Sequence, residues 1–201
     1  MEQPAPLKKL LRRMRRRGTS GSAALQFAMV APVFFTLLLG VFQAGIIFFA
    51  QQTLQNAVMD TGRLIRTGQD KCFSLNNGAC VPMNGQDFFN SICSRVAALM
   101  ACTSTSNGST SSLIQYDVQN YQAFGGNMNA SPLDANGNLP PMNNFQPGNS
   151  CDVVLVRVFY KWPIQAPGLD WFLVDMADHG HLLAAATAFR SEPYTTNNGG
   201  C

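Results

Sequence analysis

The sequence predicts an α+β protein in which a long N-terminal transmembrane helix continues into a domain with a small antiparallel sheet. Three observations lead to this expectation. The 42 residues between Arg17 and Asp60 contain no Asp, Glu, Lys or Arg. Helical spacing of apolar residues then continues past this uncharged stretch. Strand-forming segments and all six cysteines follow it, and a chain of 201 residues has room for one such domain and its attachment.

The charge is divided unevenly along the chain. Only 12% of the residues are charged, against about 25% in a typical soluble domain. Residues 1–17 hold seven bases and one acid, a net charge of +6, whereas the remainder holds seven bases and ten acids, a net charge of −3. The overall charge of +3 therefore describes a cationic tip on a mildly acidic body. This pattern argues against a nucleic-acid partner and indicates membrane topology.

Residues 22–50 form the expected transmembrane helix, with Gln26 and Gln43 as its only strongly polar interruptions. The bilayer core needs roughly 20 helical residues, so this run is long enough to cross it. A cleaved signal peptide would have a shorter apolar region and a small-residue cleavage site, and a buried core helix would be shorter. The basic residues upstream predict that residues 1–21 are a cytoplasmic leader and that the chain after the helix is extracytoplasmic.

Residues 51–68 are expected to continue the same helix with one apolar face, formed by Leu54, Ala57, Val58, Leu64 and Ile65. Gly68 is the predicted stop. A helix over about residues 23–66 would be about 66 Å long. Pro32 within it removes one helical hydrogen bond and favours a kink.

Residues 69–201 form the expected extracytoplasmic α+β domain. The sequence predicts a helix over residues 87–100 and strands over 113–121, 151–162 and 181–191, the second ended by Pro163. Residues 103–112 and 125–150 read as polar loops, and 163–176 as a turn with a short helix or loop. In the first strand, alternation places Ile114, Tyr116 and Val118 inward and Leu113, Gln115 and Asp117 outward.

Both ends of the chain carry a recognisable pattern. The segment RRRGTSGSAALQFAMVAPVFF, continued to Arg63, and the segment HLLAAATAFRSEPY at residues 181–194 resemble TadE-like pseudopilins (TadE/TadF/TadG-like) of the tight-adherence Flp pilus system. The resemblance implies that a prepilin peptidase cuts after Gly21, which makes Ser22 the first mature residue. Gln26 occupies the position at which the family normally has Glu. Arg190, Glu192 and Pro193 correspond to the closing motif of the family.

The resemblance implies a pilin-like domain and a structural function. A member would be a membrane-anchored pseudopilin or minor pilin in Flp pilus assembly and secretion. Its partners would be the lipid bilayer, the prepilin peptidase, other pilins or pseudopilins and the Tad inner-membrane assembly proteins. It would cross the bacterial inner membrane once, with a cytoplasmic N-terminus and a periplasmic domain. The alternative is a signal-anchored extracytoplasmic binding or enzymatic module unrelated to pili.

All six cysteines follow the apolar run, as a disulfide framework in an oxidising compartment predicts. Fifteen pairings are possible in principle. We favour pairing of neighbours, which joins Cys72 to Cys80, Cys93 to Cys102, and Cys151 to Cys201. A zinc site is the alternative, but the cysteines show no short C-x-x-C spacing.

The sequence gives no reason to expect catalysis. It contains no G-x-S-x-G elbow, Walker loop, H-E-x-x-H motif or dinucleotide fingerprint. The only histidines, His179 and His181, are interpreted as turn residues before the last strand rather than as metal ligands. We therefore expect a non-enzymatic protein without a cofactor or a metal.

Overall fold

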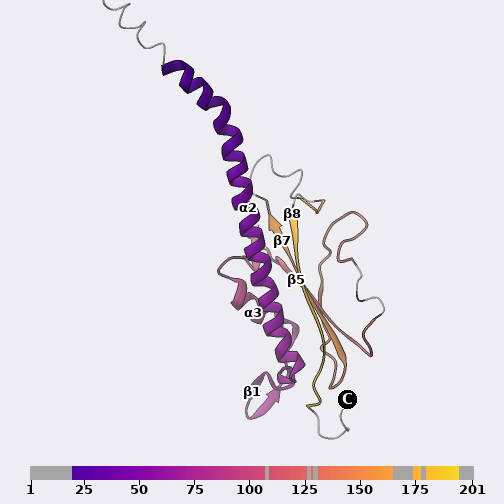
Figure 1. Cartoon of the computed structure of the whole chain (residues 1–201). Helices are drawn as coiled ribbons and strands as arrows, with labels where there is room; N and C mark the ends of the chain where they lie inside the picture. Colours follow the sequence, from indigo (N-terminus) through magenta and orange to yellow (C-terminus); the bar gives the residue numbers. More distant parts are fainter. Residues whose placement is uncertain are drawn as a thin grey trace, which may run out of the picture. The chain divides into compact units, whose positions relative to one another are not determined.

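The computed structural model describes residues 20–106, 109–125, 128, 131–164, 174–177 and 180–194. The chain divides into two compact units, Met1–Ala44 and Gly45–Cys201, and we call the second the domain unit. Figure 1 shows the elements in chain order.

Helix α2 spans Ser20–Arg66, which confirms the expected helix of about residues 23–66. Its 47 residues correspond to about 70 Å of helix. The helix continues through Pro32, and the Thr36 hydroxyl donates a hydrogen bond to the Pro32 carbonyl oxygen at 2.7 Å. It ends near Gly68, whose φ of +74° lies in the left-handed region that glycine adopts without strain.

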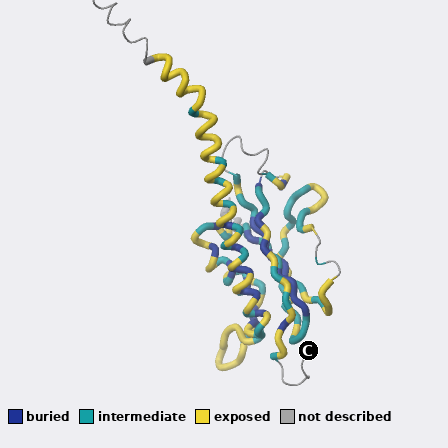
Figure 2. The backbone as a smooth tube through the Cα atoms, viewed as in Figure 1, coloured by how far each residue is buried: buried dark blue, intermediate teal, exposed yellow. Residues whose placement is uncertain are grey.

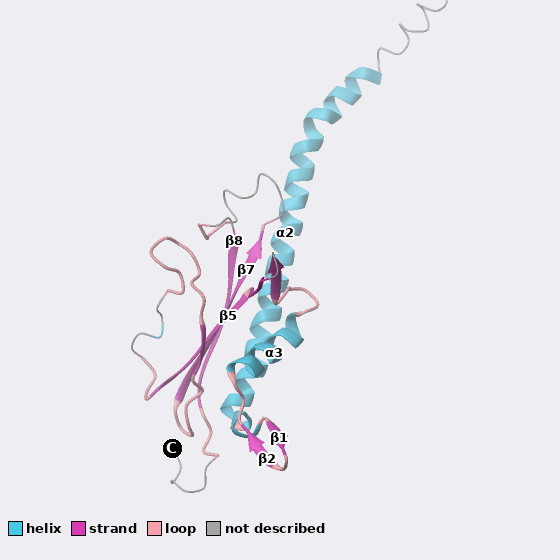
Figure 3. Ribbon diagram, turned by 180° about the vertical axis from the view of Figure 1, so that it is seen from behind, coloured by secondary structure: helices cyan, strands magenta, loops and turns pink. Residues whose placement is uncertain are grey.

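A four-stranded sheet forms the centre of the domain unit, in the order β6-β5-β7-β8. Its strands are β5 (Ile114–Tyr121), β6 (Asn143–Phe145), β7 (Val153–Pro163) and β8 (Gly180–Arg190). The pairs β5–β7 and β7–β8 are antiparallel (Figure 3). Strand β6 is parallel to β5. The α+β fold class is therefore confirmed. The sequence did not predict β6, which lies within the segment expected to be a loop.

The main core lies between one face of this sheet and two helices. The second part of α2 contributes Leu54, Ala57, Val58 and Ile65, all buried, and Leu64 packs against them, as the helical spacing predicted. Helix α3 (Gly85–Val96) contributes Phe88, Ile92 and Val96. The carboxamide oxygen of Asn84 accepts hydrogen bonds from the backbone N–H groups of Gln86 and Asp87, which caps α3.

The expected alternation is confirmed for Ile114, Tyr116 and Val118, which are buried in the main core. The opposite face of the sheet is also covered, however, so Asp117 is not exposed to solvent as expected. Asp117 is 2% exposed and forms an ion pair with Arg157, which faces it on β7. The Asp117 Oδ1 atom also accepts hydrogen bonds from the side chains of Gln119 (2.8 Å) and Asn144 (3.3 Å). A buried carboxylate needs such partners. Asp117 thus faces away from the main core without facing water.

Other corrections concern short elements. Residues 103–112, expected to be a loop, contain the hairpin β3 (Thr103–Ser106) and β4 (Ser109–Ser112). A second hairpin, β1 (Ser74–Asn76) and β2 (Ala79–Val81), follows the 3₁₀ turn η1 (Gln69–Cys72). Helix α3 ends at Val96 instead of Met100, and Leu113 packs partly buried against the main core instead of facing outward. The segment 165–173 lies outside the described residues.

Candidate functional site: the N-terminal helix and its attachment

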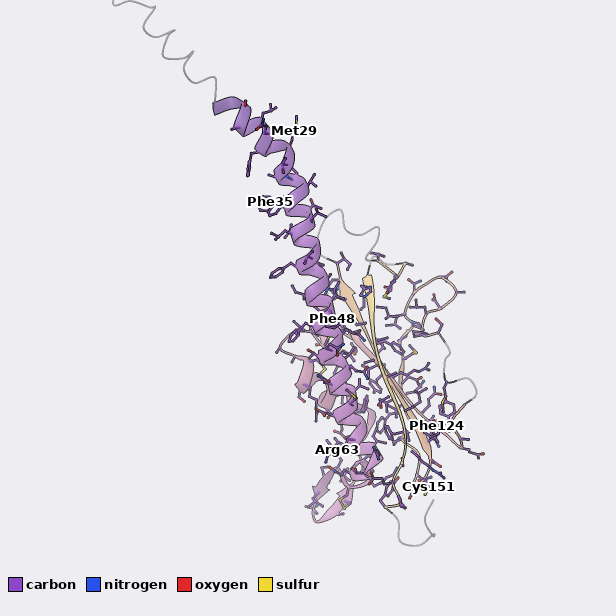
Figure 4. The ribbon with its side chains drawn as sticks, in the orientation of Figure 1. Met29, Phe35, Phe48, Arg63, Phe124 and Cys151 are labelled. Carbon is purple, nitrogen blue, oxygen red and sulfur yellow. A yellow bond between two sulfur atoms is a disulfide. The ribbon has the colours of Figure 1, made fainter. Side chains whose placement is uncertain are left out.

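The first part of α2 exposes its large apolar side chains. Phe27, Val41 and Phe42 are 68%, 75% and 68% exposed, and Figure 2 shows this part of the helix almost entirely as exposed. Figure 4 shows Met29, Phe35 and Phe48 projecting outward from the helix. Among the described residues, α2 is the one helix long and apolar enough to cross a membrane. A run of exposed apolar residues of this length indicates membrane anchoring.

The residues assigned to processing lie at the beginning of this helix. Gly21, Ser22 and Gln26 are all exposed and fall within its first two turns. A Cβ atom added to Gly21 would meet nothing within 4 Å, so the backbone there is open. The rest of the expected leader, residues 1–19, lies outside the described residues.

The change from exposed to buried is abrupt. Phe48 and Phe49 are 67% and 63% exposed, whereas Ala50 is fully buried. From Ala50 onward, one face of α2 packs against the sheet, and Met59 is the only exposed large apolar residue that remains on the helix. Within a single turn, the apolar side chains of the helix therefore change from exposed to buried in the core.

Two glutamines one helical turn apart attach α2 to the edge strand β8. The Gln51 side-chain amide donates a hydrogen bond to the Ala184 carbonyl oxygen at 2.6 Å, and that of Gln55 donates to the Ala186 carbonyl oxygen at 3.1 Å. Further along, Gly62 approaches β8 so closely that an added Cβ would lie 3.1 Å from a Thr187 methyl carbon. The helix is thus fixed in register along β8.

The residues of the expected closing motif attach the end of α2 to the end of β8. Arg66 and Glu192 form an ion pair at 3.4 Å, and the Glu192 backbone N–H donates to the Arg66 carbonyl oxygen at 2.9 Å. The Arg190 Nε atom donates to the carbonyl oxygen of Cys151, two residues before β7, at 3.0 Å. Pro193 follows as an exposed residue. Two motif residues therefore join the ends of three elements that lie far apart in sequence.

A buried polar cluster lies beside this junction. Asp70 is 2% exposed and forms an ion pair with Lys71 at 3.2 Å, and Lys71 Nζ also donates to the Gly148 carbonyl oxygen at 2.5 Å. Burial raises the pKa of Asp70 although Lys71 opposes the shift. The ring of Tyr194 lies directly against Gly68, where a larger residue would collide with it. Burial, together with the Asp70 and Asp152 carboxylates, raises the pKa of Tyr194 to about 12.

Two of the favoured disulfides are present. Cys72, at the end of η1, is bonded to Cys80 on β2, and Cys93 is bonded to Cys102. Cys151 is also disulfide-bonded. Its expected partner, Cys201, lies outside the described residues.

His181 is the second residue of β8, where it pairs with Trp162, and not a turn residue before the strand as expected. His181 Nδ1 lies 3.1 Å from a carboxylate oxygen of Asp175, whose other oxygen accepts the Leu182 backbone N–H at 2.7 Å. These contacts hold the start of β8 to the preceding segment. Within the described ranges, three or more His, Cys, Asp or Glu side chains do not gather in a metal-binding group. His179 lies outside those ranges.

The comparisons with known proteins find the family at the N-terminal helix. Residues 21–63 match the family model described as TadE-like protein. Curated proteins and solved structures gave no match. The matched segment begins at Gly21 and extends through the exposed part of α2 into the part that packs against the sheet. Over residues 21–63, the resemblance to TadE-like proteins is therefore confirmed.

Proposed function

We propose that this chain is a membrane-anchored pseudopilin or minor pilin that takes part in assembly of a Flp-type, tight-adherence pilus. The observation that carries the proposal is α2 itself. Its exposed apolar part lies within the segment that matches the TadE-like family, and the same helix continues into the core of the domain unit. Such a subunit needs both properties, because the helix must reside in lipid and must also position the domain.

In this proposal the chain crosses the bacterial inner membrane once. The seven bases of residues 1–17 keep the N-terminus in the cytoplasm, and the domain unit lies in the periplasm. The disulfides support this location because they persist in an oxidising compartment. We propose a structural rather than an enzymatic role.

Contacts with other pilin-type helices would form along the exposed part of α2. Ala24 and Ala28, and likewise Gly40 and Ala44, are pairs of small residues one helical turn apart. Small residues at this spacing allow the backbones of two helices in lipid to approach closely. Gln26 can accept a hydrogen bond from a neighbouring N-terminal amine but cannot neutralise its charge.

The test is the N-terminus of the protein from cells that contain the prepilin peptidase. Mass spectrometry of the membrane-extracted chain is expected to show Ser22 as the first residue. In the matched variant Gly21→Val, the residue before the cut is changed, and the full leader should be retained. An intact leader in the unmodified chain would contradict the proposed processing, while the membrane anchor would still stand.

A second experiment separates the pilin role from a simple tether. The apolar segment, residues 22–49, is replaced by an unrelated apolar helix of equal length, while residues 50–201 are kept. If the chain is a pilin-type subunit, it should no longer crosslink to other pilins and pilus assembly should be lost. If the helix is only a tether, the replacement should leave both unchanged. The variant Gln26→Glu, which restores the acid, is expected to increase the fraction recovered with pilins.

A further inference from the structure

The β7–β8 end of the sheet lies level with the exposed apolar turns of α2. Strand β8 runs alongside α2 in the same direction, because Gln51 contacts Ala184 while Arg66 contacts Glu192. Three strand residues from Ala184 back to His181 cover about 10 Å. That distance equals about six to seven helical residues, which counted back from Gln51 ends near Gly45, the start of the domain unit. Figures 1 and 3 show the two strand ends beside this part of α2 from opposite sides.

Five apolar residues gather at this end of the sheet, beside the His181–Asp175 contact, and are only partly covered. They are Trp162, Pro163 and Ile164 at the end of β7, together with Val174 and Leu182, and we call these five residues the sheet end. Pro163 is exposed and the other four are half-buried. Pairing of Trp162 with His181 and of Pro163 with Gly180 places the two strand ends at one level. On α2, Ile46, Phe48 and Phe49 are exposed in the same unit.

Within the domain unit, no spacer along α2 separates the exposed apolar residues from those that pack on the sheet. Phe49 is exposed and Ala50 is in the core, so lipid-facing and sheet-facing residues are adjacent along α2. The headgroup layer on each side of a bilayer is only about 5–8 Å thick. If Phe48 and Phe49 reach the edge of the hydrocarbon, the sheet end must enter this layer.

We propose that the sheet end rests in the lipid headgroup layer. The inference depends on the membrane anchor proposed above and adds a second contact with the bilayer, made by the domain. Trp162 suits such a position, because tryptophan is enriched where apolar lipid meets water. Its ring lies 6.2 Å from that of Tyr160 and packs against the main core, so it is fixed to the sheet. The domain would thus be held against the membrane at two places, α2 and the sheet end.

Tryptophan fluorescence in vesicles tests the inference on the full-length chain. The chain has two tryptophans, so Trp171→Phe leaves Trp162 as the only one. The protein is reconstituted into vesicles of equal parts phosphatidylcholine and phosphatidylglycerol that carry a nitroxide either on the headgroup or midway along the acyl chain. Headgroup nitroxide should quench Trp162 about twofold more than mid-chain nitroxide does.

The matched control places a single tryptophan at the other end of the domain unit. In Trp162→Phe/Trp171→Phe/Phe124→Trp, the probe replaces a residue that is 61% exposed. Phe124 follows β5 and lies near Cys151, away from Phe48 (Figure 4). This probe should not be quenched by either lipid. A second variant, Leu182→Trp with both native tryptophans replaced by Phe, places a probe on β8 and should be quenched as Trp162 is.

The outcomes separate the two proposals. Vesicle flotation after alkaline carbonate treatment reports on the anchor independently of fluorescence. A chain that floats, with Trp162 and Leu182→Trp quenched no more than the Phe124→Trp control, overturns the sheet-end contact and leaves the anchor intact. A chain that does not float overturns the anchor and with it this inference.

Discussion

Residues 21–49 and 50–66 belong to one continuous helix, yet their side chains are used in opposite ways. The first part directs phenylalanines such as Phe27, Phe42 and Phe48 away from the protein. The second part has no aromatic residue, and small residues face the sheet: Ala50 and Ala57 are buried, and Gly62 approaches β8. Polarity differs too, since Gln51 and Gln55 bond to the backbone of β8. Both parts are helical. They differ in whether their apolar side chains are left exposed or are packed against the sheet.

The largest difference in stability between the two parts should appear when a leucine in each part is replaced by alanine. Leu54→Ala removes a fully buried side chain and should lower the free energy of unfolding of the domain by about 2–5 kcal/mol. Leu38→Ala, at a residue 46% exposed, should leave it unchanged. Thermal unfolding in detergent micelles, followed by near-ultraviolet circular dichroism, measures both. Equal losses would show that the two parts share one packed environment.

A charged residue introduced into the first part of α2 tests whether that part lies in lipid. Leu39→Arg places an arginine within the apolar part, at an apparent insertion cost of about 2.5–3.5 kcal/mol. The carbonate-resistant membrane fraction should fall sharply. Asn56→Arg, on the exposed face of the second part, is the matched control and should leave that fraction unchanged. If Leu39→Arg also remained in the membrane fraction, lipid would not be the surroundings of residue 39.

Two glycines give a smaller and sharper contrast. Gly62→Ala would place a Cβ 3.1 Å from Thr187 and 3.2 Å from Phe189, and overpacking costs about 1–3 kcal/mol. Gly45→Ala meets nothing within 4 Å and should stabilise the helix by up to about 1 kcal/mol. The same unfolding measurement should therefore give changes of opposite sign. A stabilising Gly62→Ala would mean that β8 can move away from α2 at little cost.

The smallest effect is expected at the end of the second part. Both side chains of the Arg66–Glu192 ion pair are about half exposed, so Glu192→Gln should cost no more than about 1 kcal/mol. The backbone hydrogen bond from Glu192 to Arg66 remains in this variant. A double-mutant cycle with Arg66→Gln isolates the pair. A loss as large as that of Leu54→Ala would indicate that the ion pair, rather than core packing, fixes the helix end.

Much of the fold could be predicted because its long elements have strong periodic signals. The apolar stripe of Leu54, Val58 and Ile65 and the dense Val and aromatic content of β7 each identified an element. The hairpins were missed because their strands are three or four residues long and lack apolar alternation. Their signal was the Asn-Gly pairs at residues 77–78 and 107–108, a dipeptide typical of tight hairpin turns.

The site was predictable in its residues but not in its contacts. The motif pointed to Arg190 and Glu192, yet no pattern indicated that they meet Cys151 and Arg66. Asp117 was placed in solvent because alternation assigns a face and does not reveal what covers it. Its partner Arg157 lies 40 residues away in sequence, and such long-range pairing depends on the strand register. Gln51 and Gln55 gave only a weak signal, two amides one turn apart on the helix.

The two glutamine contacts have a consequence for a protein that is concentrated in a membrane. Strand β8 is at the edge of its sheet, and an open edge can recruit a strand from another molecule into a growing aggregate. The carbonyl groups of Ala184 and Ala186 already accept hydrogen bonds from α2. Intruding chains would have to break these bonds first, so crowded copies can meet through their helices without fusing their sheets.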